Sequence, residues 1–415
     1  MLFARIKPLF ELSLPANFYG FRKRRQAADL THALALAVEK CKSFNRPFFW
    51  AKLDIKKAFD HVSHHRILEG LLLRGVAVLE ARAMVKFFRL TVLQFSLPNG
   101  VGGEFEVRPT RGVLQGLSAS PLLFNMVLAD ALELWNVERS PKLDGGLRFD
   151  GLDVESMFFA DDGIIMGNSL ADPQKLIRWY HGRFSEYGFT IQLGKSLWGA
   201  NRVVHGDLLV NGEVIPKSPH PYIPILGVQI AMNGSTLPSI RHRLQATWHY
   251  WAERKHIYCN RSAKSLTRIR LMCKIVAFVL LWGHEHWKLT DAERKILRGA
   301  QIRMVRLALC IPNYSWEEIG HYLRRGYREA RAFLLTNGIE FWDERAVEQQ
   351  LTWAGHMHRN HNMGLAGHIY NFRNLQWQQT MCVLSGGKTF GRALAGNISQ
   401  WGDELYWWGL SGGHV

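Results

Sequence analysis

Residues 156–166 read SMFFADDGIIM, and this stretch decides the predicted fold. Two short apolar runs flank the adjacent carboxylates of Asp161 and Asp162, and the Asp-Gly step at residues 162–163 is a hairpin-turn signal. The pattern predicts a β-hairpin with both carboxylates at its tip, where both can reach one region of space. Two adjacent carboxylates repel each other unless a cation lies between them, and such oxygen ligands suit Mg²⁺ or Mn²⁺.

An Asp-Asp-Gly tripeptide alone is most often a solvated turn, so the functional interpretation depends on an upstream carboxylate. Residues 48–60 read FFWAKLDIKKAFD, an apolar strand that ends at Asp54. An Asp at a strand end facing the hairpin would complete a metal site, and Asp60 is placed to cap a following helix. Phe59 can fold back over such a site, although a core aromatic is the simpler alternative. The histidines that follow are expected to form one helical surface.

A loop that leads into a helix separates these two stretches. Residues 111–121 read RGVLQGLSASP, in which Ser120 fits the N-cap and Pro121 the first helical position. Glycines let the backbone approach a ligand closely, and a helix N-terminus suits nucleotide or template contact. Many loop-to-helix junctions share this pattern, so in isolation it indicates little.

Further elements are predicted around these motifs. A helix begins at Asp172-Pro173, Gly188 ends it, and a strand covers residues 189–193, followed by Lys195 near a phosphate or simply at the surface. Residues 208–215 form a hairpin that turns at Asn-Gly, and residues 224–230 form a short strand. Upstream, residues 14–25 read LPANFYGFRKRR, where Arg22 either contacts a triphosphate or belongs to a solvated basic loop.

Composition narrows the class of protein. The chain has 415 residues, of which 47% are apolar, so it is globular and long enough for two to three domains. Its net charge of +17 favours a polyanionic partner, and residues 241–330 alone contain 18 Lys or Arg against 7 Asp or Glu. A merely basic protein is the alternative.

Two further classes of protein are disfavoured by the sequence. The five dispersed cysteines include no CxxC pair, which predicts neither a zinc site nor a disulfide framework and fits a reducing, intracellular setting. The longest apolar run, residues 275–283, is shorter than the ~20 residues of a membrane span, so no membrane partner is expected.

Together these motifs resemble a reverse transcriptase of the non-LTR (LINE-like) retrotransposon type. The first three catalytic motifs of that family resemble AKLDIKKAFD (51–60), GVLQG with SPLLF (112–116, 120–124) and FADD (159–162). GFTI with KS (188–191, 195–196) is similar to the fourth motif. LGV (226–228) is similar to the primer-grip hairpin of the family, and NFYGFR (17–22) to its fingers motif. Thumb elements are similar to WGHEHW, RMVR and WAGH (282–287, 303–306, 353–356).

The resemblance implies an α+β right-hand polymerase fold with fingers, an antiparallel palm sheet and a helical thumb. The expected domains are partial fingers (1–50), a palm with a fingers insertion (51–240), a basic helical thumb (241–345) and a C-terminal extension (346–415). The chain looks N-terminally truncated and lacks an endonuclease domain, so missing segments are expected from a longer polyprotein. Nuclear localisation follows from the family's need to copy at chromosomal DNA.

The resemblance also implies a two-metal active site for RNA-directed DNA synthesis, with Asp54, Asp161 and Asp162 as the catalytic carboxylates. Two Mg²⁺ (or Mn²⁺) ions would also contact the backbone carbonyl of Ile55, and Phe59 would stack under the incoming sugar. The remaining implied contacts are Arg22, Gln115, Gly116 and Lys195 with the nucleotide or template, and Leu226 and Gly227 with the nucleic acid. The implied partners are an RNA template, a DNA primer and dNTPs.

Two alternatives remain open at this point. One is a catalytically inactive, nucleic-acid-binding retrotransposon relic, and the other is an RNA-dependent RNA polymerase or an intron maturase on the same palm. RNA-copying RNA polymerases typically carry Asp at the position of Phe59 and Gly at that of Ala160, so a DNA-making enzyme is favoured. Leu114 stands where the family often has a polar residue, and residues 117–119 read LSA in place of a more common Asp-Pro-Leu. These changes would alter template contacts without touching metal binding.

Overall fold

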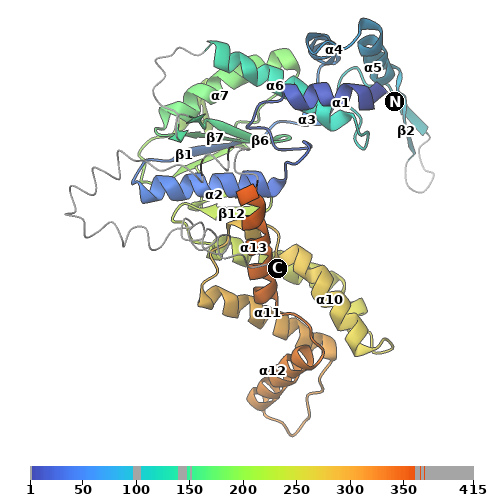
Figure 1. Cartoon of the computed structure of the whole chain (residues 1–415), viewed down its shortest axis with the longest axis vertical. Coiled ribbons are helices and arrows are strands. Elements are labelled where there is room, and N and C mark those ends of the chain that lie inside the picture. Colours follow the sequence, from blue (N-terminus) through green and yellow to red (C-terminus); the bar gives the residue numbers. More distant parts are fainter. Residues whose placement is uncertain are drawn as a thin grey trace, which may run out of the picture. The chain divides into compact units, whose positions relative to one another are not determined.

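The computed structural model describes residues 2–96, 104–138, 147–149 and 152–359, together with Leu365 and Ile369. These residues form two compact units (Figure 1). The first contains the described residues up to Ala33 and from Lys40 to Pro221, together with Leu365 and Ile369, and the second contains Leu34 to Glu39 and Tyr222 to Arg359. Helices and antiparallel strands occur together, which confirms the α+β prediction.

A four-stranded antiparallel sheet forms the centre of the first unit. Its order is β6 (Ser156–Phe159), β7 (Asp162–Gly167), β1 (Phe49–Leu53) and β8 (Leu197–Ala200). Both faces of β7 are covered, and its residues from Gly163 onward are buried, as expected for a central apolar run. The sheet therefore holds the ends of β1 and β7, which carry the predicted carboxylates, on its best-covered strands.

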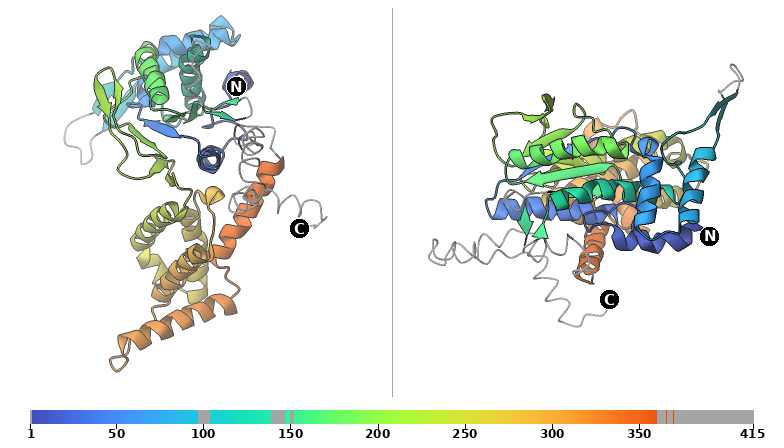
Figure 2. Two further views of the ribbon diagram at one scale, coloured as in Figure 1. Left: turned by 90° about the vertical axis from the view of Figure 1, so that its left-hand side faces the viewer. Right: turned by 90° about the horizontal axis from the view of Figure 1, so that it is seen from above.

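Helices pack around this sheet, and α6 and α7 lie side by side over one face (Figures 1 and 2). The helix α6 is apolar on nearly every side because it crosses the middle of the core, where Leu123, Phe124 and Val127 are fully buried. The helices of this unit are α1 (Leu2–Ser13), α2 (Ala27–Ser43), α3 (Ala58–His61), α4 (His64–Leu73), α5 (Val78–Leu90), α6 (Ser120–Glu138), α7 (Ala171–Phe184) and the 3₁₀ turn η1 (Ser185–Tyr187).

Short hairpins complete the first unit. They are β2 (Leu93–Ser96) with β3 (Glu104–Val107), β4 (Arg148–Phe149) with β5 (Leu152–Asp153), and β9 (Leu208–Val210) with β10 (Glu213–Ile215). The predicted Asn-Gly turn is confirmed, because Asn211 and Gly212 join β9 to β10 with φ of 52° and 86°.

The second unit is a hairpin followed by helices with their own core. The hairpin joins β11 (Tyr222–Ile225) to β12 (Val228–Ala231). The helices are α8 (Leu237–Glu253), α9 (Lys255–Tyr258), α10 (Ser265–Leu280), η2 (His284–His286), α11 (Asp291–Leu309), α12 (Ile319–Thr336) and α13 (Trp342–Arg359). Trp251, Tyr258 and Trp287 are buried in this core. Among the residues described, no helix has the length and apolarity needed to cross a membrane.

Three local predictions are wrong. Residues 189–193 form no strand and make only one bridge, between Ile55 and Ile191, because β8 takes the sheet edge beside β1. Residues 224–230 are two strands, since the chain reverses at Leu226, where φ is 48°. Asp60 does not cap α4; Ser63 does, through its side-chain oxygen and the N–H of Arg66, because the short helix α3 intervenes.

Candidate active site

The turn of the β6–β7 hairpin differs by two residues from the predicted one. Phe159 pairs with Asp162, so Ala160 and Asp161 form the turn, and Ala160 has the left-handed φ of 54°. Asp162 is the first residue of β7 rather than part of the turn. Asp161 therefore lies at the tip of the hairpin, and Asp162 lies within the ladder.

Gly163 has a packing role that explains why the Asp-Gly step is not the turn. A Cβ atom added at Gly163 would lie 2.5 Å from the ring of Phe158, which is fully buried. Phe158 also stacks on Phe18, at 5.4 Å between ring centroids, and residues 17–19 run along β6 through backbone hydrogen bonds. The glycine is thus required by side-chain packing and not by a left-handed backbone.

The strand register brings the first carboxylate to the hairpin. In the β1–β7 pair, Lys52 faces Ile164 and Leu53 faces Gly163. Continuing that register by one residue places Asp54 opposite Asp162, on the same face of the sheet as Lys52. The ammonium of Lys52 lies 2.9 Å from an Asp162 carboxylate oxygen.

The charges that act on Asp161 come from its neighbours in this region. Burial raises the pKa of Asp161, and the negative charges of Asp162 and Asp54 raise it further, while Lys52 lowers it. Among the described residues, no three acidic, His or Cys side chains are close enough to hold a metal ion as they stand. The donor set nevertheless fits a hard divalent cation, because it consists of oxygens whose mutual repulsion such an ion would relieve.

The backbone of Asp54 is held by the segment after η1. The hydroxyl of Ser196 accepts a hydrogen bond from the Asp54 N–H at 3.1 Å, and the Gln192 N–H donates to the Asp54 carbonyl at 2.8 Å. Sequence reasoning assigned a role to the exposed Lys195 and missed the fully buried Ser196 beside it. The isolated β-bridge between Ile55 and Ile191 is formed by the carbonyl of Asp54 and the N–H of Lys56, so the Ile55 carbonyl takes no part in it.

Phe59 lies half-buried in an aromatic cluster beside the carboxylates. Its ring stacks on Phe124 at 4.6 Å between centroids and meets the edge of Phe21 at 6.3 Å. Phe21, which is half exposed, also lies 6.2 Å from Phe159, the last residue of β6. The cluster therefore connects the fingers-like segment, the first motif and the hairpin.

The glycine-containing loop of the second motif is bonded directly to the segment that carries Phe59. The Val113 N–H donates to the Phe59 carbonyl at 2.8 Å, and a Cβ at Gly112 would lie 2.6 Å from the Asp60 carbonyl oxygen. Gln115 and Gly116, at the top of the loop, are exposed. The loop thus presents the two predicted contact residues next to Phe59.

The histidines after the first motif do not form one exposed surface. His64 is buried, and its Nε2 lies 2.8 Å from the Gly112 carbonyl oxygen, so it supports the same loop. Burial lowers the pKa of His61, and the positive charges of Arg111 and Lys56 lower it further. The exposed side chains of Arg111 and Lys56 therefore lie near His61, and sequence reasoning assigned a role to neither of these two cations.

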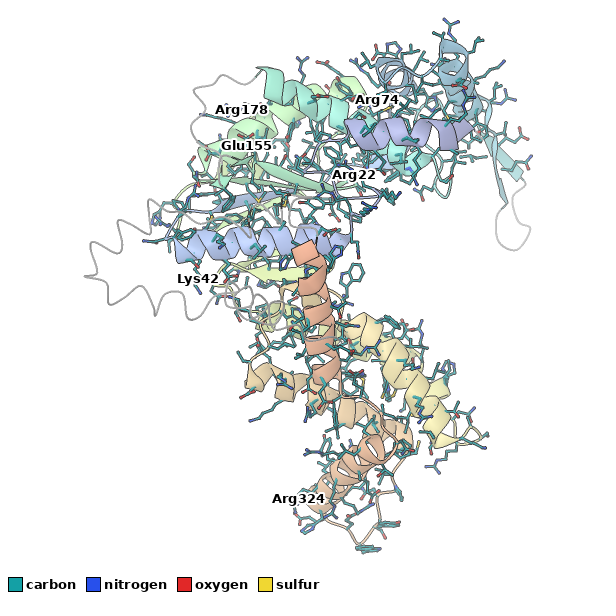
Figure 3. All side chains as sticks on the ribbon, in the orientation of Figure 1. Arg22, Lys42, Arg74, Glu155, Arg178 and Arg324 are labelled. Carbon is teal, nitrogen blue, oxygen red and sulfur yellow. The ribbon has the colours of Figure 1, made fainter. Side chains whose placement is uncertain are left out.

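Arg22 occupies a structural position in the first unit (Figure 3). Its guanidinium donates to the carbonyl oxygens of Pro15 at 2.5 Å and Glu11 at 3.1 Å, and lies 3.7 Å from the Glu11 carboxylate. These contacts hold the segment that carries Phe21.

Leu226 and Gly227 form the turn of the β11–β12 hairpin in the second unit. The indole N–H of Trp282 donates to the Leu226 carbonyl at 2.7 Å, and Arg243 donates to the Gly227 carbonyl at 3.4 Å. The predicted hairpin at this motif is therefore present, and α8 and the end of α10 hold its turn in place.

Comparison with known proteins adds a family and several relatives. The family model for reverse transcriptase (RNA-dependent DNA polymerase) matches residues 1–230. The Pol polyprotein of the type-1 retrotransposable element R2 of Nasonia vitripennis is 30% identical over 142 residues, which are 34% of this chain and 13% of that protein. The corresponding R2 protein of Popillia japonica is 29% identical over 193 residues, 46% of this chain and 28% of that one.

The chain thus spans less than a third of the length of these curated relatives. Among solved structures, the chain is similar to telomerase from Candida albicans in complex with a fragment of telomeric RNA. That likeness has a TM-score of 0.43 and 9% identity, and covers 78% of this chain and 55% of the telomerase chain.

Proposed function

The chain belongs to the reverse transcriptase (RNA-dependent DNA polymerase) family, as its motifs predict, and from this premise we propose that it extends a DNA primer on an RNA template. The sequence likeness to the R2 Pol polyproteins supports the retrotransposon type of this family. One observation supports the proposal: Leu53 pairs with Gly163 in the β1–β7 ladder, so the next residues, Asp54 and Asp162, would face each other beside the turn that carries Asp161.

We assign the chemistry to these three carboxylates. Asp54 and Asp161 would hold two Mg²⁺ (or Mn²⁺) ions, with Asp162 and the Ile55 carbonyl as supporting ligands. When bound, such ions lower the pKa of the primer 3′-hydroxyl and neutralise charge on the leaving pyrophosphate. The chain's own contribution is to hold the carboxylates rigidly: the sheet fixes Asp162, and Ser196 fixes the backbone of Asp54.

The surrounding residues would select and orient the dNTP. Phe59, braced by Phe124, would exclude a 2′-hydroxyl, and Gln115 and Gly116 would contact nucleotide or template. The exposed cations around His61 are proposed to join Lys195 in binding the triphosphate; they are Lys56, Lys57 and Arg111. Arg22 would contribute through the segment it holds, since its guanidinium already binds carbonyl oxygens.

The second unit would bind the primer–template product. Its β11–β12 turn at Leu226 and Gly227 is proposed to contact the primer strand, and its basic helices to contact phosphates. Work at chromosomal DNA would place the protein in the nucleus.

Primer extension on an RNA template with labelled dNTPs tests the proposal. We expect Mg²⁺-dependent extension that Asp161→Asn reduces by about 10³-fold, because a metal ligand contributes several kcal/mol to transition-state stabilisation. The exposed Asp207, changed to Asn, removes the same charge elsewhere and is expected to leave extension unaltered.

Two other outcomes would each support a different function for this protein. Extension with rNTPs in preference to dNTPs would indicate an RNA polymerase. Well-folded protein that binds duplex in a salt-dependent manner, without any extension and without sensitivity to Asp161→Asn, would be the inactive nucleic-acid-binding relic.

A further inference from the structure

The loop between α11 and α12 presents two stacked aromatic rings to solvent. Tyr314 and Trp316 lie 5.3 Å apart between ring centroids with an angle of 8° between their planes. Trp316 is 80% exposed and Tyr314 is 44% exposed, whereas Trp342 of the same unit is 1% exposed. An indole left so open adds little to the core, so its exposure requires another explanation.

This aromatic pair is fixed to α12 rather than carried on a free loop. Arg325 donates to the Pro312 carbonyl at 2.8 Å and to both carboxylate oxygens of Glu317, at 2.9 and 2.6 Å. Its guanidinium also lies 5.2 Å from the centroid of the Tyr314 ring. The rings are therefore held beside the turn of α12 that contains Arg325.

The outer face of α12 carries a row of arginines. Arg324 (labelled in Figure 3), Arg328 and Arg331 are all exposed, and their i, i+4, i+7 spacing places them on one side of the helix. The row spans about 10 Å at 1.5 Å per residue. The opposite side of α12, with Gly326, Ala330 and Leu334, is buried.

Two of the three acidic residues near this row are paired with Arg325, so the three arginines outnumber the one acidic residue left beside them. Glu317 and Glu329 both pair with Arg325, and the exposed Glu318 lies 3.6 Å from His321. The row therefore keeps a positive surface next to the stacked rings. Such a combination matches a single nucleic-acid strand, whose unpaired bases offer ring faces and whose phosphates follow at regular intervals.

We propose that Tyr314, Trp316, Arg324, Arg328 and Arg331, the α12 platform, bind single-stranded nucleic acid outside the polymerase site. An unpaired base stacks on the outer face of Trp316, and consecutive phosphates contact the arginine row. A duplex would use only the arginines, because its base faces are covered. The inference deepens the proposed function in one respect, since a template strand is the single strand that a reverse transcriptase would supply.

Fluorescence anisotropy of the full chain with a labelled, unstructured 12-nucleotide RNA tests the aromatic contact. Trp316→Ala is expected to weaken binding roughly 5- to 150-fold, the range for one lost base–aromatic stack. Trp316→Phe keeps a ring and should retain most of the affinity. Because the side chain is exposed, neither change should lower the melting temperature.

The arginine row is tested with a matched control that has the same spacing. The triple change of Arg324, Arg328 and Arg331 to Gln should reduce the slope of log K against log salt by about 2, at ~0.7 per phosphate contact. Changing Arg82, Lys86 and Arg89 of α5 to Gln removes the same charge, also at i, i+4, i+7 and exposed, and should change the slope much less.

The inference would be overturned by equal losses in the two triple variants or by wild-type affinity in Trp316→Ala. It would also be overturned by a duplex that binds as tightly as the single strand and without Trp316. A protein partner that binds Trp316 while the RNA does not would overturn it as well. Primer extension on a primer–template duplex with a single unpaired template nucleotide separates this inference from the proposed function, because that substrate offers the platform no longer single strand and the platform variants should extend it normally. RNA binding through Trp316 by a protein that extends nothing would refute the function and keep the platform.

Discussion

Two aspartates of this protein lie in opposite electrostatic environments. Asp343, at the start of α13 in the second unit, is 1% exposed, and Arg298 donates to both of its carboxylate oxygens at 2.9 and 2.7 Å. Arg294 lies 3.5 Å from the same carboxylate. These hydrogen bonds and charges raise the pKa of Arg298, which means that the pair favours its ionised form.

Asp161 in the first unit has no comparable arrangement. Burial and the charges of Asp162 and Asp54 raise its pKa, and the cation that opposes them, Lys52, pairs with Asp162 instead. The carboxylate of Asp343, which serves the fold, is therefore neutralised by the arginines around it. The carboxylate of Asp161, which we assign to catalysis, is repelled by the neighbouring carboxylates. The difference teaches that the first site stores unfavourable charge that a divalent ion would relieve.

The largest effect on stability is expected from removing the charge of Asp343, the carboxylate that is paired with arginine. Asp343→Asn leaves Arg298 without its bidentate partner and should lower the free energy of unfolding by about 3 kcal/mol, as measured by urea denaturation. Glu344→Gln is the matched control, because Glu344 binds the same Arg298 at 2.9 Å from an exposed position and should cost less than about 0.5 kcal/mol. Equal effects of the two changes would contradict this interpretation.

A second, smaller effect concerns the backbone that carries the first carboxylate. Ser196→Ala removes the acceptor of the Asp54 N–H in a buried position, and should lower the free energy of unfolding by about 1–2 kcal/mol. If Ser196 positions Asp54, the extension rate kcat should fall about 10-fold with little change in KM for dNTP. Ser262→Ala, at an exposed serine of the second unit, is the control. A loss of stability with unchanged kcat would make Ser196 purely structural.

Sequence patterns predicted the elements whose signals are local. The Asn211-Gly212 turn, the strand before Asp54 and the helix after the second motif all follow from residues close in the chain. The hairpin of residues 156–166 was predicted too, but its turn was misplaced. The reason is a contact with the Phe158 ring that demands Gly163, which the tripeptide does not reveal.

The parts of the site that could not be predicted depend on distant residues. Ser196 lies 142 positions from Asp54, and the link between Val113 and Phe59 joins two separate motifs. Arg22 was assigned to a ligand from its charge, whereas the folded chain surrounds it with carbonyl oxygens. A resemblance to a family identifies which residues matter, but partners so far apart in the chain become visible only when it folds.

The same Asp-to-Asn change should have the opposite effect on the free energy of unfolding at Asp161, where the neighbouring charges repel. Without metal, Asp161→Asn is expected to raise the free energy of unfolding by roughly 0.5 kcal/mol, because it removes a charge from a cluster of like charges that solvent screens in part. A raised pKa means that the folded state binds the proton more tightly, so wild type should gain stability as pH falls through the range just above ordinary carboxyl values, and the variant should not. Destabilisation by this change would contradict the comparison.

The smallest expected effect tests whether Lys52 acts as the resident counter-charge. Lys52→Met keeps the length of the side chain in β1 and removes the ammonium beside Asp162, so the three carboxylates lose their opposing charge. Both partners are about one-third exposed, which limits the expected destabilisation to about 0.5 kcal/mol at low salt. Added Mg²⁺ should cancel that loss, because a bound cation replaces the ammonium, whereas the same ionic strength of NaCl should cancel it only in part. Melting curves of Lys52→Met and wild type in the two salts decide the matter: equal rescue by both would show ordinary screening and not a cation site.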